Sequence, residues 1–430
     1  MDVLRIGASR DRARLDLLVN RRSIERTIEA RVRAIVEAVH RRGDAALIEF
    51  TRTFDGVRLS PDRLRVSPKE IEAALASVPR GLLRALRAVK RNIETYHRRQ
   101  RRASWTMQGR SGAVLGERIV PLRRVAAYVP GGVAPLVSTV LMSVVPATVA
   151  GVGEVVVATP PDKRGRVAPA ILAACALCGV EEVYRVGGAQ AIAALAYGTR
   201  RVAPVEKIVG PGNIFVMIAK KLVCGVVGLD APSGPSEVLV LADATAEARW
   251  VAADLLAQAE HGTGREFAVL VTTSKRLAEQ VRVEIGAQLD EMPALSGVRT
   301  RLERGMALVL APNLPKAIEF ANAFAAEHVE IIARDARRLS AAITNAGAIF
   351  IGPYSPVAVG DFAAGPSHCL PTGGAAKAFS GLSVDDFVKR VSTIECSRAA
   401  LRKLAPLVEE LAEAEQLPAH ARAVRARLER

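Results

Sequence analysis

The sequence is poor in aromatic residues, histidine and cysteine. Of its 430 residues, 4% are aromatic, six are His and five are Cys. A core with so few aromatic side chains must be built from Ala, Val, Leu and Ile, which suits buried parallel strands covered by Ala-rich helices. The five cysteines are scattered along the chain, which argues against a disulfide framework and predicts a reducing, cytoplasmic location.

Long hydrophobic runs are also missing. No segment approaches the ~20 apolar residues of a membrane helix, and residues 1–18 carry charges throughout, unlike a signal peptide. The apolar segment 133–152 is interrupted by proline and glycine. We therefore expect no membrane partner.

Positive charge is abundant, with a formal net charge of +16. Arginines cluster at 98–102, and paired arginines occur at 21–22 and 41–42. Such runs can bind nucleic acid, but no aromatic residues are interleaved with them and no nucleic-acid motif accompanies them. An arginine-rich, solvated surface is the simpler interpretation, and we expect no nucleic-acid partner.

The order of predicted elements indicates an α/β protein. Helical periodicity covers 23–40 and 67–102, and Ser67 with Glu70 predicts a capping box. From residue 124 onward, strands and helices alternate, with glycine-rich turns after several strands. We expect strands at 125–129, 154–158, 182–186, 207–209, 237–242, 267–272, 307–311, 329–333 and 348–352. Helices are expected between them, including 245–260 with Thr245 as its N-cap.

These elements predict two Rossmann-like α/β units, an N-terminal helical segment and a C-terminal helical arm. The expected domains are an N-terminal arm (1–24), a main α/β domain (25–127 and 238–382), an inserted cofactor domain (128–237) and a charged, mostly helical C-terminal arm (383–430).

The sequence has few candidate catalytic or metal-binding residues, and several of them lie near one another in the chain. Gln258 and His261 are three residues apart on an expected helix, so they share a face and can both bind a metal ion. Asp361 and His368 lie in a glycine-containing loop. With two His and an Asp available, a mixed nitrogen and oxygen site for Zn²⁺ is plausible. Taken singly, each of these residues also fits a packing or turn role.

Other candidate sites remain open on the residues alone. Cys175 and Cys178 form a lone CxxC inside an expected helix, where packing is the better interpretation. Glycine-rich turns after strands can accept a diphosphate, but no GxGxxG follows a strand. NAD binding therefore cannot be inferred from glycine spacing.

Taken together, several motifs resemble the histidinol dehydrogenase family from about residue 31 to residue 424. They are Tyr128-Val-Pro-Gly-Gly132, Gly187-Gly-Ala-Gln190, Val209-Gly-Pro-Gly-Asn213, Gly234-Pro-Ser236-Glu237, Gln258-Ala-Glu-His261, Glu327-His328-Val-Glu, Gly360-Asp361-Phe with His368, and Glu415 with His420. Each motif alone is weak evidence for the family. All of them together, in the family's order and spacing, are specific for it.

The resemblance implies a ligand set, a cofactor and a partner. It implies zinc held by Gln258, His261, Asp361 and His420, with His420 donated by the neighbouring subunit of a homodimer that exchanges its C-terminal arms. It implies substrate contacts from Ser236, His328, His368 and Glu415, besides the four zinc ligands. It implies NAD contacts from Tyr128, Gln190 and Asn213.

The resemblance also implies the reaction, which is oxidation of histidinol through an aldehyde to histidine. This oxidation removes four electrons from the substrate, and each NAD accepts two, so two NAD are reduced in turn. An imidazole has an unperturbed pKa of about 6.5, so His328 suits a general base. Glu327 is the candidate to activate the water that adds to the aldehyde. The metal is expected chiefly to orient the substrate.

Some positions depart from the family's pattern, and two rival functions remain. Leu136-Val137 stands where Tyr-Pro is usual, Phe362 where Tyr is common, and Ser367 where Asn is common. One rival is a related zinc and NAD dehydrogenase acting on another small polar alcohol, such as a sulfonated diol. The other is a basic nucleic-acid-binding protein on the same scaffold with an idle site.

Overall fold

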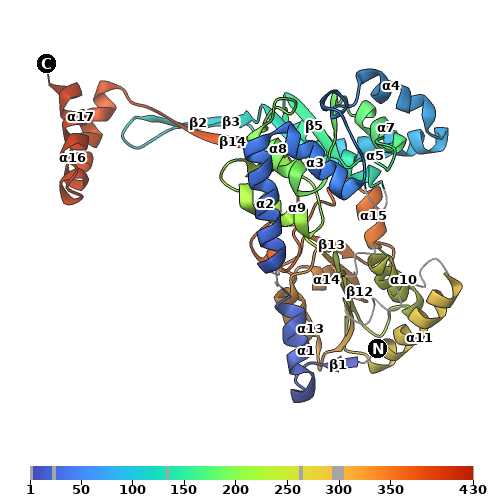
Figure 1. Ribbon diagram of the computed structural model, residues 1–430. Helices are drawn as coiled ribbons and strands as arrows, with labels where there is room; N and C mark the ends of the chain where they lie inside the picture. Colours follow the sequence, from blue (N-terminus) through green and yellow to red (C-terminus); the bar gives the residue numbers. More distant parts are fainter. Residues whose placement is uncertain (1–2, 22–25, 132–134, 261–264, 293–304, 430) are drawn as a thin grey trace.

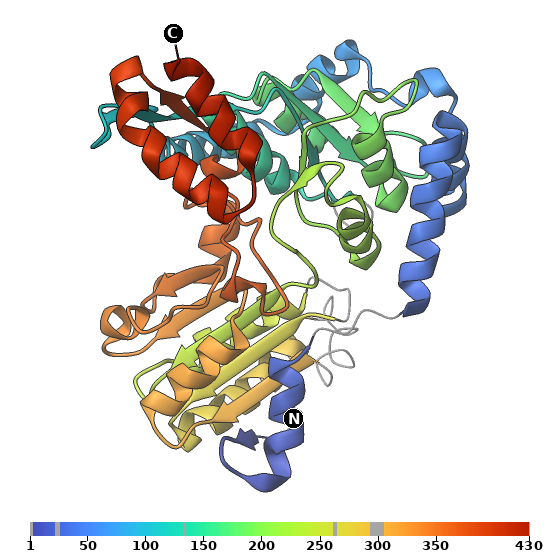
Figure 2. The ribbon, with the colours of Figure 1, turned by 90° about the vertical axis from the view of Figure 1, so that its left-hand side faces the viewer.

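The computed structural model describes residues 3–21, 26–131, 135–260, 265–292 and 305–429. In these residues two parallel sheets, each covered by helices, lie one above the other, and a ribbon of antiparallel strands leads away from them (Figures 1 and 2). This confirms the expected α/β class with parallel sheets. No helix in this part of the chain combines the length and apolar character needed to cross a membrane.

The first parallel sheet has six strands. Their order is β1 (Val3–Arg5), β11 (Met306–Leu310), β10 (Phe267–Thr272), β9 (Glu237–Ala242), β12 (His328–Ile332) and β13 (Ala348–Ile351). One face packs on α10 (Ala248–Ala259) and α11 (Lys275–Glu291), the other on α1 (Arg12–Val19), α13 (Leu314–Phe324) and α14 (Ala336–Ser340). Both faces are buried, which is why the strands are almost wholly aliphatic.

The second parallel sheet has five strands. Their order is β6 (Glu182–Arg185), β5 (Glu154–Thr159), β4 (Arg124–Tyr128), β7 (Lys207–Val209) and β8 (Gly228–Leu229). One face packs on α2 (Arg26–Arg42), α3 (Asp44–Asp55), α8 (Gly188–Tyr197) and α9 (Ile214–Val223). The other packs on α4 (Pro68–Ser77), α5 (Arg80–Arg98), α6 (Val137–Ala150) and α7 (Pro169–Leu177).

The packing groups the N-terminal helices differently from the expected domains. Residues 25–127 were expected to belong with 238–382, yet helices α2 to α5 bury their apolar faces on the five-stranded sheet. Of the described elements before residue 127, β1 and α1 are the ones that join the six-stranded sheet. Amphipathic periodicity shows that a helix has a buried face but not which sheet that face covers.

An antiparallel ribbon leads to the C-terminal helices. Strands β2 (Trp105–Gln108), β3 (Val114–Pro121) and β14 (Val388–Glu395) form a three-stranded sheet. Beyond it, α16 (Arg398–Ala414) and α17 (Pro418–Leu428) pack against each other, well away from both parallel sheets (Figure 1). The expected C-terminal arm (383–430) is therefore α-helical only after residue 397, because residues 388–395 add a strand to a β2–β3 hairpin that the sequence analysis did not predict.

Two local expectations also need correction, and one is confirmed. The capping box of Ser67 and Glu70 is present. The expected helix 67–102 is two helices, because Val78 is extended before Pro79. Thr245 caps no helix: its backbone N–H and hydroxyl both donate to Asp243, and α10 begins at Ala248.

Candidate active site

Glu327 and His328 lie at the amino edge of the six-stranded sheet. His328 is the first residue of β12 and pairs in register with Val238 of β9. Glu327 directly precedes that strand, and both residues are buried, at 7% and 3% exposure. Ligands of parallel sheets usually gather at carboxyl ends. Here the crossover helices run back to the amino edge, so α10 ends near the edge where β12 begins.

Hydrogen bonds hold the Glu327 carboxylate in one orientation. Its Oε2 atom accepts from the hydroxyl of Ser236 at 2.5 Å and from the backbone N–H of Glu237 at 2.9 Å. The same oxygen lies 3.6 Å from Nδ1 of His328. The structure therefore brings together the expected catalytic pair and the expected substrate residue Ser236.

Both ring nitrogens of His328 face oxygen atoms. Nδ1 donates to the carbonyl of Glu237 at 3.1 Å, and Nε2 lies 3.3 Å from Oδ1 of Asp361. Burial lowers the pKa of His328, but Glu327 and Asp361 outweigh it and raise that pKa to about 9. The unperturbed value on which the role of general base was argued therefore does not hold for this buried ring.

Burial raises, rather than lowers, the pKa of the neighbouring carboxyl group of Glu327. Desolvation raises the pKa of Glu327 to about 7, although His328, Ser236 and the backbone of Glu237 all lower it. A carboxyl that titrates near neutrality can take up and release a proton at working pH, as a general base requires.

Asp361 is carried by the short helix α15 (Val357–Phe362). A side chain at Gly360 would meet the ring of Phe350 at 2.5 Å, so glycine is what lets α15 approach β13 this closely. The same ring lies 5.8 Å from that of His328. The glycine in Gly360-Asp361 thus sets the position of the carboxylate beside His328.

His368 joins the two parallel sheets. Its Nδ1 donates to the carbonyl of Asp361 at 3.0 Å, and its Nε2 lies 3.2 Å from the hydroxyl of Thr139 at the start of α6. Close by, the Ser367 hydroxyl donates to the carbonyl of Met142. The amino edge of the six-stranded sheet is thereby linked to the helix that follows β4 in the other sheet.

The expected zinc ligands are only partly described. Gln258 is 3% exposed in the last turn of α10, and Asp361 is half-buried. His261 lies outside the described residues. Among the residues that are described, no group of three His, Cys, Asp or Glu side chains converges as a metal site.

The expected cofactor residues lie at the carboxyl edge of the five-stranded sheet. Tyr128 ends β4, and its hydroxyl accepts from the backbone N–H of Gly188, which follows β6, at 3.0 Å. Gly210, after β7, has φ +108°, and a Cβ there would meet the Tyr128 carbonyl at 2.2 Å. Burial raises the pKa of Tyr128 to about 12, so the phenol stays protonated.

Gln190 and Asn213 stand at helix starts on the same edge. Gln190, in the first turn of α8, is 1% exposed, and its Oε1 has no hydrogen-bond partner among the described residues. Asn213 caps α9, since its Oδ1 accepts from the N–H groups of Phe215 and Val216. Helix starts present free N–H groups to anions such as a diphosphate.

Glu415 and His420 are not brought to the other site residues. Glu415 is the C-cap of α16 and His420 lies in the first turn of α17, both exposed on the arm. In Figures 1 and 2 this helix pair stands apart from β12 and α10 within the chain.

Comparison with known proteins decides the family. The family model described as histidinol dehydrogenase matches residues 19–428. The chain belongs to the histidinol dehydrogenase family. It is 50% identical over 418 residues to a histidinol dehydrogenase of Synechococcus sp., covering 97% of this chain and 94% of the relative. It is 49% identical to that of Moorella thermoacetica, covering 94% and 95%.

A solved structure agrees with this assignment. The crystal structure of histidinol dehydrogenase from Elizabethkingia anophelis matches with a TM-score of 0.91 at 36% identity, covering 100% of this chain and 98% of that one. Membership of the histidinol dehydrogenase family makes the chain an NAD-dependent oxidoreductase of histidine biosynthesis. The two rival functions gain no support from these comparisons.

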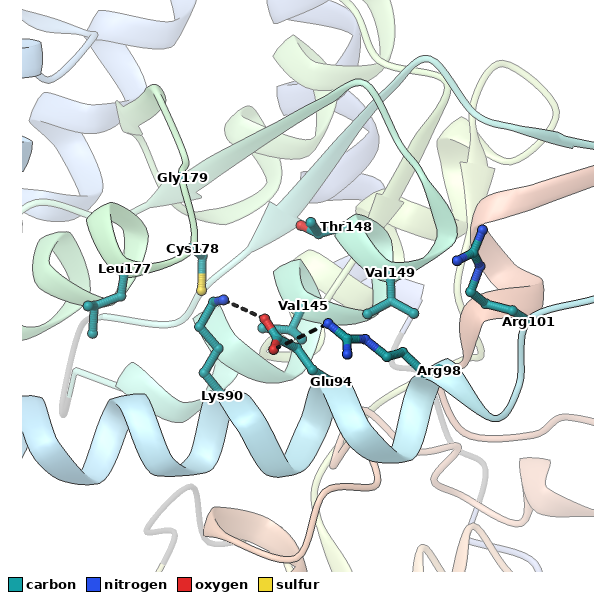
Figure 3. Close-up of a pocket in the computed structure, with 10 residues that line it drawn as sticks. All are labelled: Lys90, Glu94, Arg98, Arg101, Val145, Thr148, Val149, Leu177, Cys178 and Gly179. Atoms are coloured by element: carbon teal, nitrogen blue, oxygen red, sulfur yellow. Dashed lines mark hydrogen bonds and ion pairs between the residues drawn. The ribbon is translucent and has the colours of Figure 1, made fainter.

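One hollow of the histidinol dehydrogenase fold lies away from this site. It has a volume of 480 Å³ between α5 and the ends of α6 and α7, and Lys90, Glu94 and Arg98 line it (Figure 3). Ion pairs of Glu94 with Lys90 and Arg98 run along α5, on the wall of this hollow. Helix ends at α6 and α7 mark the amino edge of the five-stranded sheet, opposite Tyr128, so the hollow is not the cofactor edge.

Sequence analysis missed two residues that shape the site. Glu237 stood in the quoted motif beside Ser236, but its backbone contacts depend on β9 and β12 being neighbours. Thr139 lies in an apolar helix, and nothing in the sequence around it indicated a role in the site. Of the departures from the family's pattern, Leu136 and Phe362 are exposed, at 39% and 60%, whereas Ser367 is buried and hydrogen-bonded.

Proposed function

We propose that the chain oxidises histidinol to histidine through the aldehyde, with two NAD reduced in turn. The observation that carries the proposal is the contact of buried Glu327 and His328 with half-buried Asp361, at the sheet edge that His368 links to the cofactor edge. The names of the relatives favour histidinol over a sulfonated diol.

Glu327 and His328 share the proton transfers in this proposal. His328, in the deprotonated form that a pKa of about 9 makes the minor one at neutral pH, takes the hydroxyl proton of the alcohol. Glu327 takes a proton from the water that adds to the aldehyde. The pKa of Glu327 near 7 supports its role as a base at neutral pH. Ser236 donates to Glu327 and so fixes the oxygen that receives the proton. Burial keeps bulk water away from both groups.

The donor set fits zinc. An amide oxygen, a carboxylate and two imidazoles are ligands that Zn²⁺ accepts, so we assign Gln258, His261, Asp361 and the partner subunit's His420 to it. Gln258 is buried and Asp361 is half-buried, so these two oxygen donors are largely shielded from bulk water. Bound there, zinc would orient the substrate's nitrogens and take up that charge.

NAD is assigned to the carboxyl edge of the five-stranded sheet. The buried Oε1 of Gln190 has no partner among the described residues and can accept a hydrogen bond from the cofactor. The start of α9 at Asn213 offers N–H groups to a diphosphate. Tyr128 holds the Gly188 turn in place.

A homodimer with exchanged arms accounts for the position of Glu415 and His420. Both are exposed on a helix pair that stands away from the rest of its own chain (Figure 1). Leu407 and Leu411 of α16 are also exposed, at 62% and 64%, as expected of an arm that packs on a second copy. The free cysteines in the described chain suit the cytoplasm.

The test is NADH formation from histidinol. The wild type should release two NADH per histidinol, and a chelator should abolish the reaction. His328→Asn should lower the rate by about 10²–10⁴-fold, the range for loss of a general base. A preference for a sulfonated diol over histidinol, or DNA binding with no NAD reduction, would overturn the proposal.

A further inference from the structure

A buried ion pair lies directly behind the catalytic cluster. Arg21, just after α1, contacts Glu237 through two hydrogen bonds, Nε to Oε1 at 2.5 Å and Nη2 to Oε2 at 2.6 Å. Each side chain is 2% exposed. The guanidinium also stacks on Phe324, with its carbon 3.7 Å from the ring centre, and donates to the carbonyl of Leu18.

Glu237 connects this ion pair to both catalytic residues. Its backbone N–H donates to Glu327, and its backbone carbonyl accepts from His328. Its Oε1 also accepts from the N–H of Gly373 at 3.0 Å. A single residue therefore fixes the orientation of the carboxylate and of the imidazole, and its own side chain is fixed by Arg21.

We infer that Arg21 is a positioning residue for Glu327 and His328 and that it acts through Glu237. The inference rests on the proposed catalytic roles of those two residues. A buried ion pair adds little stability over apolar residues of the same size. A planar guanidinium bound through two nitrogens does, however, fix a carboxylate in one geometry.

Arg21 also balances the charge of Glu237. The groups described as facing Glu327 are His328, the first residue of β12, Ser236 and Glu237 at the start of β9, and, through His328, Asp361 on α15. Arg21 faces Glu237 from the N-terminal segment. The negative charge of Glu237 raises the pKa of Glu327. Without Arg21 that charge is uncompensated, so the pKa of Glu327 rises further and less carboxylate is present at a given pH.

The experiment measures kcat against pH for three variants of the full-length protein. In Arg21→Met, the acidic limb of the profile should move up by about 1 pH unit, the size of shift that one nearby charge causes. Activity at pH 6 should fall about tenfold and recover at higher pH. Arg21→Lys keeps the charge, so its limb should stay in place while kcat falls. In the double variant Arg21→Met with Glu237→Gln, both charges are absent, so the acidic limb should lie at the same pH as in the wild type.

Arg124→Met is the matched control, because Arg124 is also a buried arginine paired with carboxylates, at the start of β4. It should destabilise the protein without moving the limb. If Arg21→Met loses activity equally at every pH, or if the double variant keeps the shifted limb, Arg21 does not act through Glu237. Loss of NADH formation in the wild type would instead contradict the proposed function.

Discussion

The Nε2 atom of His328 lies 3.3 Å from the Oδ1 atom of Asp361. This contact joins an expected catalytic base to an expected metal ligand, although the two residues lie on different elements, β12 and α15. Together with the charge of Glu327, it raises the pKa of His328 above that of a free imidazole. It also makes proton transfer and the proposed metal binding sensitive to the same carboxylate.

The rate should depend on the ionisation of Glu327. Its pKa of about 7 lies above the ordinary value, and the active form is the carboxylate. Hence kcat should fall about tenfold per pH unit below pH 7, and it should rise again toward pH 9 as His328 loses its proton. Glu327→Gln should lose this limb and at least 100-fold in rate, about the contribution of a general base.

Glu330→Gln is the matched control for that profile. Glu330 is also buried on β12, at 1% exposure, and burial and Asp254 raise its pKa to about 9. It is therefore protonated at neutral pH, where an amide resembles it. The limb near pH 7 should persist in this variant; its disappearance would assign the limb to the wrong carboxyl.

Removing a metal ligand should lower the zinc content. In Asp361→Ala and Gln258→Ala, zinc affinity should fall by more than about 100-fold, because replacing even a hydrogen-bond partner of a metal ligand costs 10–100-fold. Metal analysis after dialysis measures the loss, and added Zn²⁺ should restore the chelated wild type. His97→Gln, at a buried histidine outside the site that pairs with Gln100, should keep its zinc. Full zinc in both ligand variants would refute the assignment.

Two inactive variants should complement each other if His420 serves the partner's site. His328→Asn and His420→Asn are each inactive alone, but mixed subunits rebuild one intact site per mixed dimer. Random pairing of equal amounts then gives about a quarter of wild-type activity. Mixing His328→Asn with Glu327→Gln is the control, since both changes fall in the same half-site and nothing should be recovered. No recovery in the first mixture would show that His420 works within its own chain or not at all.

The turn that carries Asn213 should depend on a buried ion pair. Lys220 donates to the carbonyl of Gly210 and to Asp230, each of them buried, and the Gly210 N–H donates to Asp230. Lys220→Met leaves Asp230 buried and unpaired, so the free energy of unfolding should fall by about 3–5 kcal/mol.

The same variant should also raise the Kd for NAD, measured by titration. Lys220→Met with Asp230→Asn should recover most of the stability, because no charge is left buried without a partner. An unchanged Kd in a folded Lys220→Met would separate this ion pair from cofactor binding.

The sequence predicted what depends on short-range patterns. Alternation of aliphatic strands and helices gave the α/β class, and most strands begin and end within a residue or two of the expected positions. The capping box at Ser67 followed from local chemistry. Motif order identified the family, and the same motifs supplied Glu327, His328 and Asp361.

Only the tertiary structure decided which of those residues meet. The contact of His328 with Asp361, the role of Glu237 and the packing of α2 to α5 on the five-stranded sheet all depend on strand order, which local periodicity does not encode. The shifted pKa values of Glu327 and His328 depend on burial and on neighbours distant in sequence. Composition and spacing thus determined which side chains are available. The packing of two sheets determined the distances between them and their pKa values, because electrostatic effects depend on separation in space.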